Sequence, residues 1–248
     1  MAKKKNDKSI IAVCIQEPFE DGSCMDLGAI KGDELRFLHQ AFITDTINHA
    51  LATGEADVRL YYIDSPDRKK FVRIILDYIA RKSSGAAADT FQNGFTQVEM
   101  EKDRWGVRIE RVFDDCFAQG YNNVLVVGSR TPTITSGMMK RALKMLRESD
   151  AVFGPTPEGR YYVIGMSGEV HIRLSEFDWK SQSIYSDVVR AFTEQGLAWS
   201  ELEIWYAVET PDDIDFMVRD INQYRFEGDE HTARETEIVM GRFLSSLG

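Results

Sequence analysis

The sequence predicts an α/β protein, a three-layer sandwich in which helices cover both faces of a mainly parallel β-sheet. Two patterns indicate this fold class. Short apolar runs bounded by Gly or Pro are typical of buried strands, and segments with apolar residues at helical spacing alternate with them. A hydrophobic share of 43% in 248 residues is also enough for a large core without disulfides or structural metals.

The first elements follow this alternation. Residues 10–15 form a continuous apolar run and are expected to be a buried first strand. A long loop with three glycines follows over residues 16–32, and loops of this length are more often functional than idle. Asp33 is expected to cap a helix that ends at Gly54.

The next segment repeats the pattern. Residues 58–63 are expected to form the second strand, and residues 71–79 carry apolar side chains at helical spacing. Residues 83–97 are small and polar, so we expect them to form a loop.

The chain is organised around residues 121–166, where three apolar runs enclose one amphipathic helix. These runs are residues 124–127, 151–153 and 161–164. The arrangement is typical of a strand–helix–strand unit in a parallel sheet. Because ligands bind at the carboxyl ends of such strands, the loops 128–135 and 154–160 are the first candidates for a site.

The remaining elements complete one domain. The pattern predicts helices over residues 105–117 and 184–192, a strand over 203–208, a helix beginning at Pro211 and a C-terminal helix over 228–248. No linker or internal repeat separates them. We therefore expect a single domain over residues 10–248, after a disordered basic tail over residues 1–9.

Charge and cysteine content limit the function classes. The formal net charge of −10 argues against binding to nucleic acid or to an anionic membrane. The longest apolar stretches are too short to cross a bilayer. Cys14, Cys24 and Cys116 form neither a metal pattern nor a disulfide framework, which is typical of a reducing cytoplasm. We expect a cytoplasmic protein without a membrane span.

Several common catalytic motifs are missing. The four histidines are His39, His49, His171 and His231. Their spacing matches neither a zinc site nor a nucleophile triad, and the first two are expected at the surface of their helix. The chain also lacks the Walker and dinucleotide-binding glycine motifs and the Gly-x-Ser-x-Gly elbow.

The central stretch supports a more specific comparison. GSRTP at residues 128–132, followed by an amphipathic helix and SDAVFGPTPEGRYYVIGM at 149–166, resembles a bacterial family of glycosyltransferase-like proteins with the GT-A (nucleotide-diphospho-sugar transferase) fold. More distantly, it resembles nucleotidyltransferases that load GMP or CMP onto small phosphorylated acceptors. Weaker matches at LHQAFITDTINHAL, FQNGFTQVEMEKDRWGVRIERVF and AVETPDDI extend the resemblance over most of residues 10–225.

The resemblance implies substrates, a cofactor and site residues. The substrates would be a nucleotide or nucleotide sugar and a small-molecule acceptor, with Mg or Mn bridging the diphosphate. Residues 16–22 would approach the base. Glu209 keeps a carboxylate at the family's second acidic position and could be a metal ligand. Glu158 could serve as a general base toward an acceptor hydroxyl or be a solvated turn carboxylate. The implied phosphate and acceptor contacts are Gly128, Ser129, Arg130, Thr131, Pro132, Gly159, Arg160 and Tyr161.

The chain departs from the family pattern where phosphate or metal would bind. The family's Gly-Ser-Asp-x-Pro loop reads Gly128-Ser129-Arg130-Thr131-Pro132, so the metal-binding acid has become Arg130. Its Asp-Gly-Gly-Tyr-Tyr reads Glu158-Gly159-Arg160-Tyr161-Tyr162, and its Asp-x-Asp-Thr reads Ala207-Val208-Glu209-Thr210. The first long loop lacks a Lys-Thr-Arg-Leu-like run and has the acids Glu20, Asp21 and Asp26.

Arg130 and Arg160 each allow more than one interpretation. Arg130 could be solvated in its loop, pair with a carboxylate such as Glu158 or Glu209, or replace the cation by gripping a phosphate or carboxylate. Arg160 could be a loop charge or a second phosphate or acceptor contact. Tyr161 and Tyr162 could place one ring in the core and stack the other on a base or sugar.

Two main functional hypotheses follow. The first is a transferase that moves a glycosyl or nucleotidyl group from an activated nucleotide to a small acceptor. The second is a catalytically impaired relative that binds a nucleotide, another anion or a partner protein, because the acid at position 130 is missing. A third is a purely structural subunit with the helix at 228–247 as its contact surface.

Overall fold

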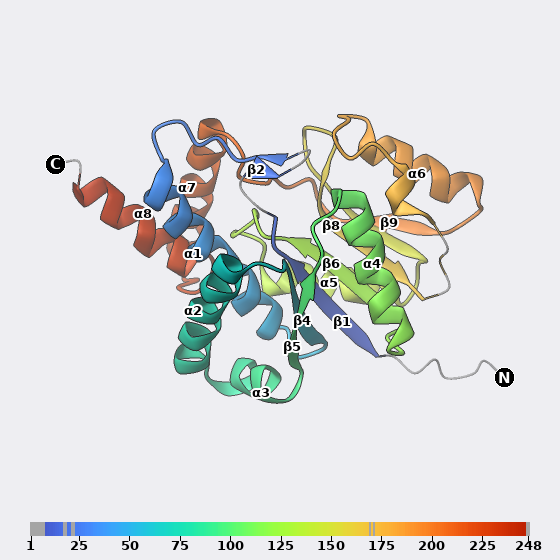
Figure 1. Cartoon of the computed structure of the whole chain (residues 1–248), viewed down its shortest axis with the longest axis horizontal. Helices are drawn as coiled ribbons and strands as arrows, with labels where there is room; N and C mark the ends of the chain where they lie inside the picture. The colour runs from blue at the N-terminus through green and yellow to red at the C-terminus, as the bar shows by residue number, and fades with distance from the viewer. Residues whose placement is uncertain (1–7, 17–18, 21–22, 169, 171, 247–248) are drawn as a thin grey trace.

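The computed structural model describes residues 8–16, 19–20, 23–168, 170 and 172–246. In this part of the chain a seven-stranded sheet is covered by helices on both faces (Figure 1). The sheet strands are β1 (Ser9–Cys14), β4 (Asp57–Ile63), β5 (Phe95–Met100), β6 (Asn123–Gly128), β7 (Ala151–Pro155), β8 (Tyr161–Ser167) and β9 (Trp199–Glu201). A separate two-stranded ribbon consists of β2 (Phe19–Glu20) and β3 (Ser23–Cys24).

The strand order is β5-β4-β1-β6-β8-β7-β9, and every neighbouring pair is parallel except the two that involve β8. The α/β class with a mainly parallel sheet is therefore confirmed. Within the central unit the prediction needs one correction, because β8 runs antiparallel between β6 and β7. A short turn joins β7 to β8, and two strands joined by a short turn must be antiparallel.

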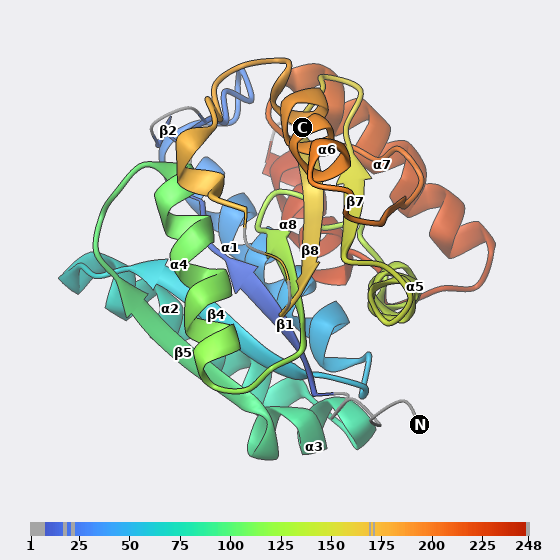
Figure 2. The same cartoon turned by 90° about the vertical axis from the view of Figure 1, so that its right-hand side faces the viewer.

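Three layers result from the helices. In the described residues they are α1 (Gly32–Leu51), α2 (Pro66–Lys82), α3 (Gly85–Asn93), α4 (Trp105–Ala118), α5 (Ser136–Leu146), α6 (Ile184–Glu194), α7 (Pro211–Phe226), α8 (Arg234–Ser246) and a 3-10 turn at Leu174–Glu176. The α1, α2 and α5 helices pack on one face of the sheet, and α4 and α6 on the other (Figure 2).

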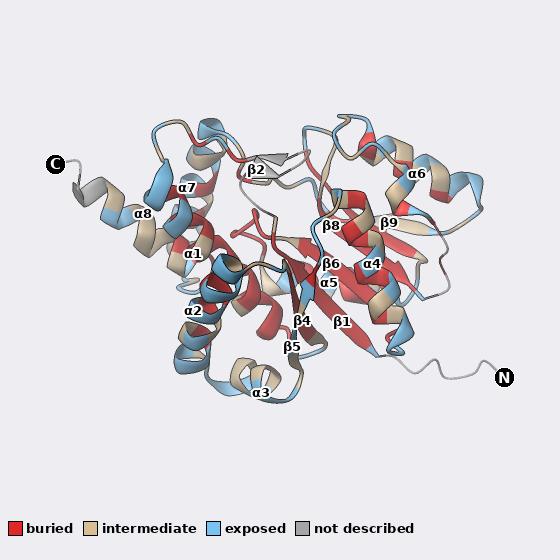
Figure 3. Ribbon diagram, viewed as in Figure 1, coloured by how far each residue is buried: buried red, intermediate tan, exposed pale blue. Residues whose placement is uncertain are grey.

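The burial of the central strand β1 on both faces explains why its sequence is one continuous apolar run. Ile11 and Val13 face the core under α1, α2 and α5, while Ile10, Ala12 and Cys14 face the core under α4 and α6. Successive side chains of a strand point to opposite faces, so a strand covered on both sides must be apolar throughout. Figure 3 shows the strands buried at the centre of the molecule.

Residues 83–97 do not form the predicted loop. They contain α3 and the start of β5. Three consecutive alanines, which favour helix, follow Ser84 at the N-cap, and the helix ends at Gly94. The strand that follows is an edge strand paired only with β4, and its outward side chains are polar, so it lacks the apolar run of a central strand.

Four other boundaries also differ from prediction. Residues 203–208 are not a strand: β9 lies earlier, and the chain then runs irregularly beside β7, with the Trp205 amide donating to the Pro155 carbonyl at 3.1 Å. Asp33 lies inside the first turn of α1 instead of capping it. The C-terminal helix begins at Arg234. The predicted tail falls mostly outside the described residues, but Ser9 already belongs to β1.

The start of α7 agrees with prediction and positions part of the site. Pro211 is the first helical residue, and Thr210 and Asp213 form a reciprocal capping box. The Asp213 carboxylate also accepts the Glu209 amide at 3.0 Å, which fixes the backbone where Glu209 projects. None of the helices in the described ranges combines the length and apolarity needed to span a membrane.

Candidate functional site

A cavity of about 140 Å³ lies at the edge of the sheet where β1, β6 and β7 end and β8 begins. Gln16 follows β1, Gly128 ends β6 and Thr156 follows β7. Because β8 is antiparallel, its first residues lie at this same edge, and Tyr161 lines the cavity. The carboxyl ends of parallel strands are the usual ligand-binding edge of an α/β sheet.

One wall of the cavity carries Glu209 and Arg160, which form an ionic group with Arg130 behind them. Glu209 accepts a hydrogen bond from Arg130 Nη1 at Oε1, 3.1 Å away, and one from Arg160 Nη1 at Oε2, 3.3 Å away. The Arg130 side chain is only 1% exposed, whereas Glu209 and Arg160 are 25% and 31% exposed. The carboxylate therefore joins one buried and one partly exposed guanidinium.

Each member of this group is fixed by its backbone. Arg130 follows β6, and its carbonyl accepts the Val208 amide at 2.8 Å, which draws the segment before α7 over the loop. Arg160 lies in the turn between β7 and β8, after Gly159 with a φ of +74°. A Cβ at position 159 would lie 2.1 Å from the Gln182 carbonyl oxygen, so this turn requires glycine.

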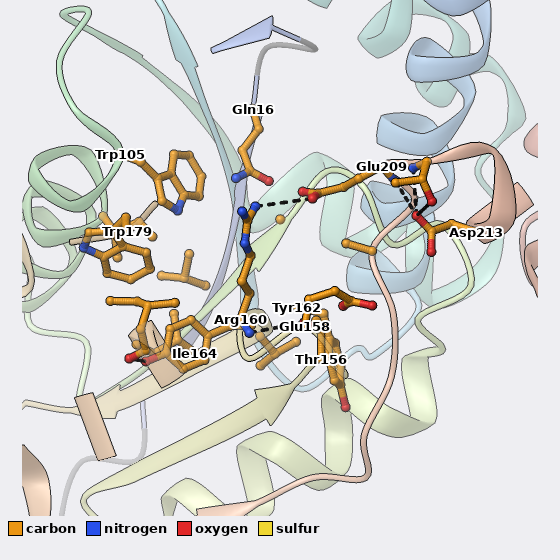
Figure 4. A pocket seen from close by; sticks show the side chains of 18 residues that line it. Gln16, Trp105, Thr156, Glu158, Arg160, Tyr162, Ile164, Trp179, Glu209 and Asp213 are labelled. Carbon is orange, nitrogen blue, oxygen red and sulfur yellow. Dashed lines mark hydrogen bonds and ion pairs between the residues drawn. The ribbon is translucent and has the colours of Figure 1, made fainter. Parts of the chain in front are cut away.

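The opposite wall is aromatic. Trp105 and Trp179 lie on one side of the Arg160 side chain, and Glu209 and Asp213 lie on the other (Figure 4). Trp179 is oriented by a hydrogen bond from Nε1 to the Leu174 carbonyl at 2.7 Å, and its ring centroid lies 5.8 Å from that of Tyr161. The cavity thus offers flat apolar surfaces beside a cation, an arrangement suited to a ring that carries an anionic group.

The structure brings together only part of the set of site residues named from the sequence. Gly128, Glu158, Arg160, Tyr161 and Glu209 line the cavity. The other five do not line it: Ser129, Arg130, Thr131, Pro132 and Gly159. Ser129, Arg130, Thr131 and Pro132 are buried. Arg130 therefore acts on the cavity through Glu209, and of its three interpretations the structure shows the ion pair.

Several lining residues were not named individually by the sequence reasoning. Gln16 and Thr156 lie in segments expected near a site, residues 16–22 and 154–160, and Asp213 lies in the stretch AVETPDDI, but no motif separated the three from ordinary loop and cap residues. Trp105 marks the start of a predicted helix, and for Trp179 the sequence favours a core or rim aromatic but also allows the wall of an acceptor pocket; both residues line the cavity. In the loop expected near a base, residues 17–18 and 21–22 lie outside the described residues.

Comparison with known proteins places the chain in a family. The model of the family described as "Uncharacterized protein conserved in bacteria (DUF2064)" matches residues 46–181. The chain belongs to this family. A search of curated proteins gave no match to the sequence.

Solved structures share the fold of this DUF2064 protein. A protein from Desulfovibrio desulfuricans G20, provisionally classed as a nucleotide-diphospho-sugar transferase, is 21% identical with a TM-score of 0.69, covering 95% of this chain and 97% of that one. A nucleotidyl transferase from Methanothermobacter thermautotroptrophicus is 11% identical with a TM-score of 0.56, and the match covers 86% of this chain and 98% of that one. The 4-diphosphocytidyl-2C-methyl-D-erythritol synthase of Anaerococcus prevotii DSM 20548 is 14% identical with a TM-score of 0.54, and the match covers 88% of this chain and 98% of that one. These likenesses confirm the predicted GT-A fold.

The residues of this DUF2064 protein do not fit the divalent cation that the resemblance implies. A guanidinium stands at position 130 in place of an acid, and both carboxylate oxygens of Glu209 already accept hydrogen bonds from arginines. Within the described ranges, no group of three or more His, Cys, Asp or Glu side chains could hold a metal. A divalent cation needs several oxygen ligands, and positions 130 and 209, where the resemblance implies metal ligands, offer none that is uncommitted.

The structure corrects the expected surface positions of His39 and His49. Both are buried, because α1 packs against α2 and α8 as well as the sheet, so no side of the helix is left to solvent there. His39 Nε2 lies 3.4 Å from Ser129 Oγ. Burial, with a smaller contribution from the charge of Arg130, lowers the pKa of His39 to about 3, and burial lowers that of His49 to about 4.

We expect His39 to make the protein less stable in mild acid. The unfolded chain takes up a proton near pH 6.5, whereas the folded chain resists it to about pH 3. The stabilisation by neutral His39 is thus present above pH 6.5 and is lost as the pH falls. Between pH 6.5 and 5 the loss is about 2 kcal/mol. Urea unfolding should show that the free energy of unfolding declines less between pH 7 and pH 5 for His39→Phe than for the wild type.

Two comparisons control this experiment. His231→Phe, at an exposed position, should decline as the wild type does. His39→Phe should keep part of the decline, because the pKa of His49 is lowered too. Equal declines for the wild type and His39→Phe would contradict the assignment.

Proposed function

We propose that the protein binds a nucleotide or nucleotide sugar at the cavity and holds its phosphate with Arg160 instead of a divalent cation. The observation that supports this most directly is the ionic group itself, in which Glu209 lies between Arg130 and Arg160 at the ligand-binding edge of the sheet. A guanidinium that already binds a carboxylate has the geometry to bind phosphate oxygens.

The rest of the cavity supports the same ligand class. A base or sugar ring can stack on Trp105 or Trp179 while its phosphate reaches Arg160 between them and Glu209. The fold is shared with a protein classed as a nucleotide-diphospho-sugar transferase and with a nucleotidyl transferase. Together these features favour a ligand with a ring at one end and phosphate at the other.

Transfer of a glycosyl or nucleotidyl group to a small acceptor is the second candidate. Glu158 is exposed and lines the cavity, so its carboxylate could take a proton from an acceptor hydroxyl. A guanidinium that is fixed in the protein adapts less well than a metal ion to the charge that develops during group transfer. We therefore favour ligand binding over catalytic turnover as the function.

The test is a melting experiment with a panel of nucleoside diphosphates and nucleotide sugars, each with EDTA or with Mg²⁺ or Mn²⁺. A bound nucleotide at a hundredfold excess over its dissociation constant should stabilise the fold by about 2.7 kcal/mol in EDTA as well as with metal. Arg160→Met should lose this stabilisation, because the cavity loses its partly exposed cation.

The matched control is Arg141→Met, which removes an exposed arginine paired with Glu203 outside the cavity. It should respond to nucleotides as the wild type does. Stabilisation that requires metal, or none with any nucleotide, would contradict the proposal. Release of free nucleotide from a bound nucleotide sugar when small acceptors are added would support transfer.

A further inference from the structure

Glu209 makes two ion pairs, the Arg130 arm and the Arg160 arm of the ionic group, and they are unequal. The Arg130 arm is shorter, at 3.1 Å, and ends on a fully buried guanidinium. The Arg160 arm is longer, at 3.3 Å, and both of its side chains are partly exposed. Arg160 Nε is buried and has no hydrogen-bond partner within the described residues. The Arg160 arm is therefore the weaker one, and it leaves a guanidinium donor unused.

Glu209 occupies a position on Arg160 that an anionic ligand would need. Its carboxylate belongs to the same chain and is held in place by the Asp213 bond to its amide, so its effective concentration at Arg160 is high. A ligand that binds Arg160 through Nη1 must displace Glu209 from it, and the Glu209 carboxylate then remains on Arg130. The exchange also allows Arg160 to turn and use its Nε.

We propose that Glu209 is a built-in competitor that occupies Arg160 and lowers the affinity of the site for anionic ligands, an inference that rests on the proposed function. A carboxylate ligand has the same charge and the same two oxygens as Glu209, and it gains nothing by replacing it. A phosphate or diphosphate carries more charge, so it binds the guanidinium more strongly than a carboxylate does and displaces the internal carboxylate at a lower concentration.

The experiment measures binding of pyrophosphate and of acetate, in EDTA, by titration calorimetry. Glu209→Gln keeps a hydrogen-bond acceptor for Arg130 but removes the charge that competes for Arg160. We expect pyrophosphate to bind the variant about fivefold more tightly than the wild type, the effect of losing one partly exposed ion pair. Acetate should gain by a similar factor, because an internal competitor lowers the affinity of every ligand that needs the same donor by the same factor.

Two further variants keep the inference open to contradiction. If Glu209→Gln does not fold, the double variant Arg130→Met/Glu209→Gln removes both charges of the Arg130–Glu209 pair and should show the same gain. Glu203→Gln breaks an ion pair outside the cavity and should match the wild type. Unchanged or weaker pyrophosphate binding in the folded Glu209 variants would overturn the inference.

The outcomes also separate this inference from the proposed function. If the wild type binds pyrophosphate and Arg160→Met does not, phosphate binding at Arg160 stands whatever the Glu209 variants do. If neither the wild type nor the Glu209 variants bind, both proposals fail. Binding by the Glu209 variants alone would support the competitor role directly.

Discussion

Replacing Arg130 with alanine is expected to lower the free energy of unfolding by about 3–5 kcal/mol. Arg130 is among the largest side chains that are fully buried in the described structure, so alanine leaves a void beneath the cavity. The change also removes one partner of the ion pair with Glu209, whose side chain is only 25% exposed. Urea unfolding at pH 7 measures the loss.

Companion variants separate charge from packing at position 130. Arg141→Ala breaks an ion pair whose side chains are about half exposed, and it should cost no more than about 1 kcal/mol. Arg130→Met/Glu209→Gln fills the space with an apolar chain and removes both charges, so it should recover much of the stability. A loss below about 1 kcal/mol for Arg130→Ala would mean that the buried pair contributes little.

Replacing Asp45 with alanine is expected to destabilise the protein by about 3 kcal/mol and to loosen α8. Asp45 lies on α1 and is 2% exposed. Its carboxylate accepts the Glu235 amide at 3.0 Å, the Thr236 amide at 2.9 Å and the Thr236 hydroxyl at 2.7 Å. It therefore caps the start of α8 from a different helix, and its loss leaves these donors unsatisfied.

The measurement combines urea unfolding with amide hydrogen exchange at pH 8. Burial raises the pKa of Asp45 to about 7, so at pH 8 the experiment compares the variant with a wild type in which Asp45 is mainly a carboxylate. Exchange should accelerate in α8 more than in the sheet strands. Asp77→Ala, which removes an exposed carboxylate from α2, should change neither quantity. Equal acceleration throughout the chain would indicate general destabilisation instead of a local cap.

Sequence patterns predicted the structure correctly where a single local rule determines it. The apolar run of β1 predicts a strand covered on both faces, and Pro211 after Thr210 predicts the start of α7. The edge strand β5 was missed because its polar outward face resembles a loop in sequence. His39 was wrongly expected at the surface, because apolar spacing along a helix does not indicate how many other elements pack around that helix.

The site was predictable only in part, for a related reason. The sequence marks Arg130, Arg160 and Glu209 as departures at phosphate- or metal-binding positions, but each allows several partners. Arg130 and Glu209 are 79 residues apart, and Arg160 and Glu209 are 49 apart. Their meeting depends on the antiparallel insertion of β8 and on the irregular segment that carries Glu209 past Arg130.

By itself the sequence determined the alternation of strands and helices, the GT-A resemblance and the replacement of an acid by Arg130. Only the tertiary structure decided that this guanidinium is buried, that it shares one carboxylate with Arg160, and that two tryptophans face them across a cavity. The physical reason is that backbone preference and apolar spacing act over a few residues. Ion pairs and cavities form between segments that become neighbours only when the sheet order is set.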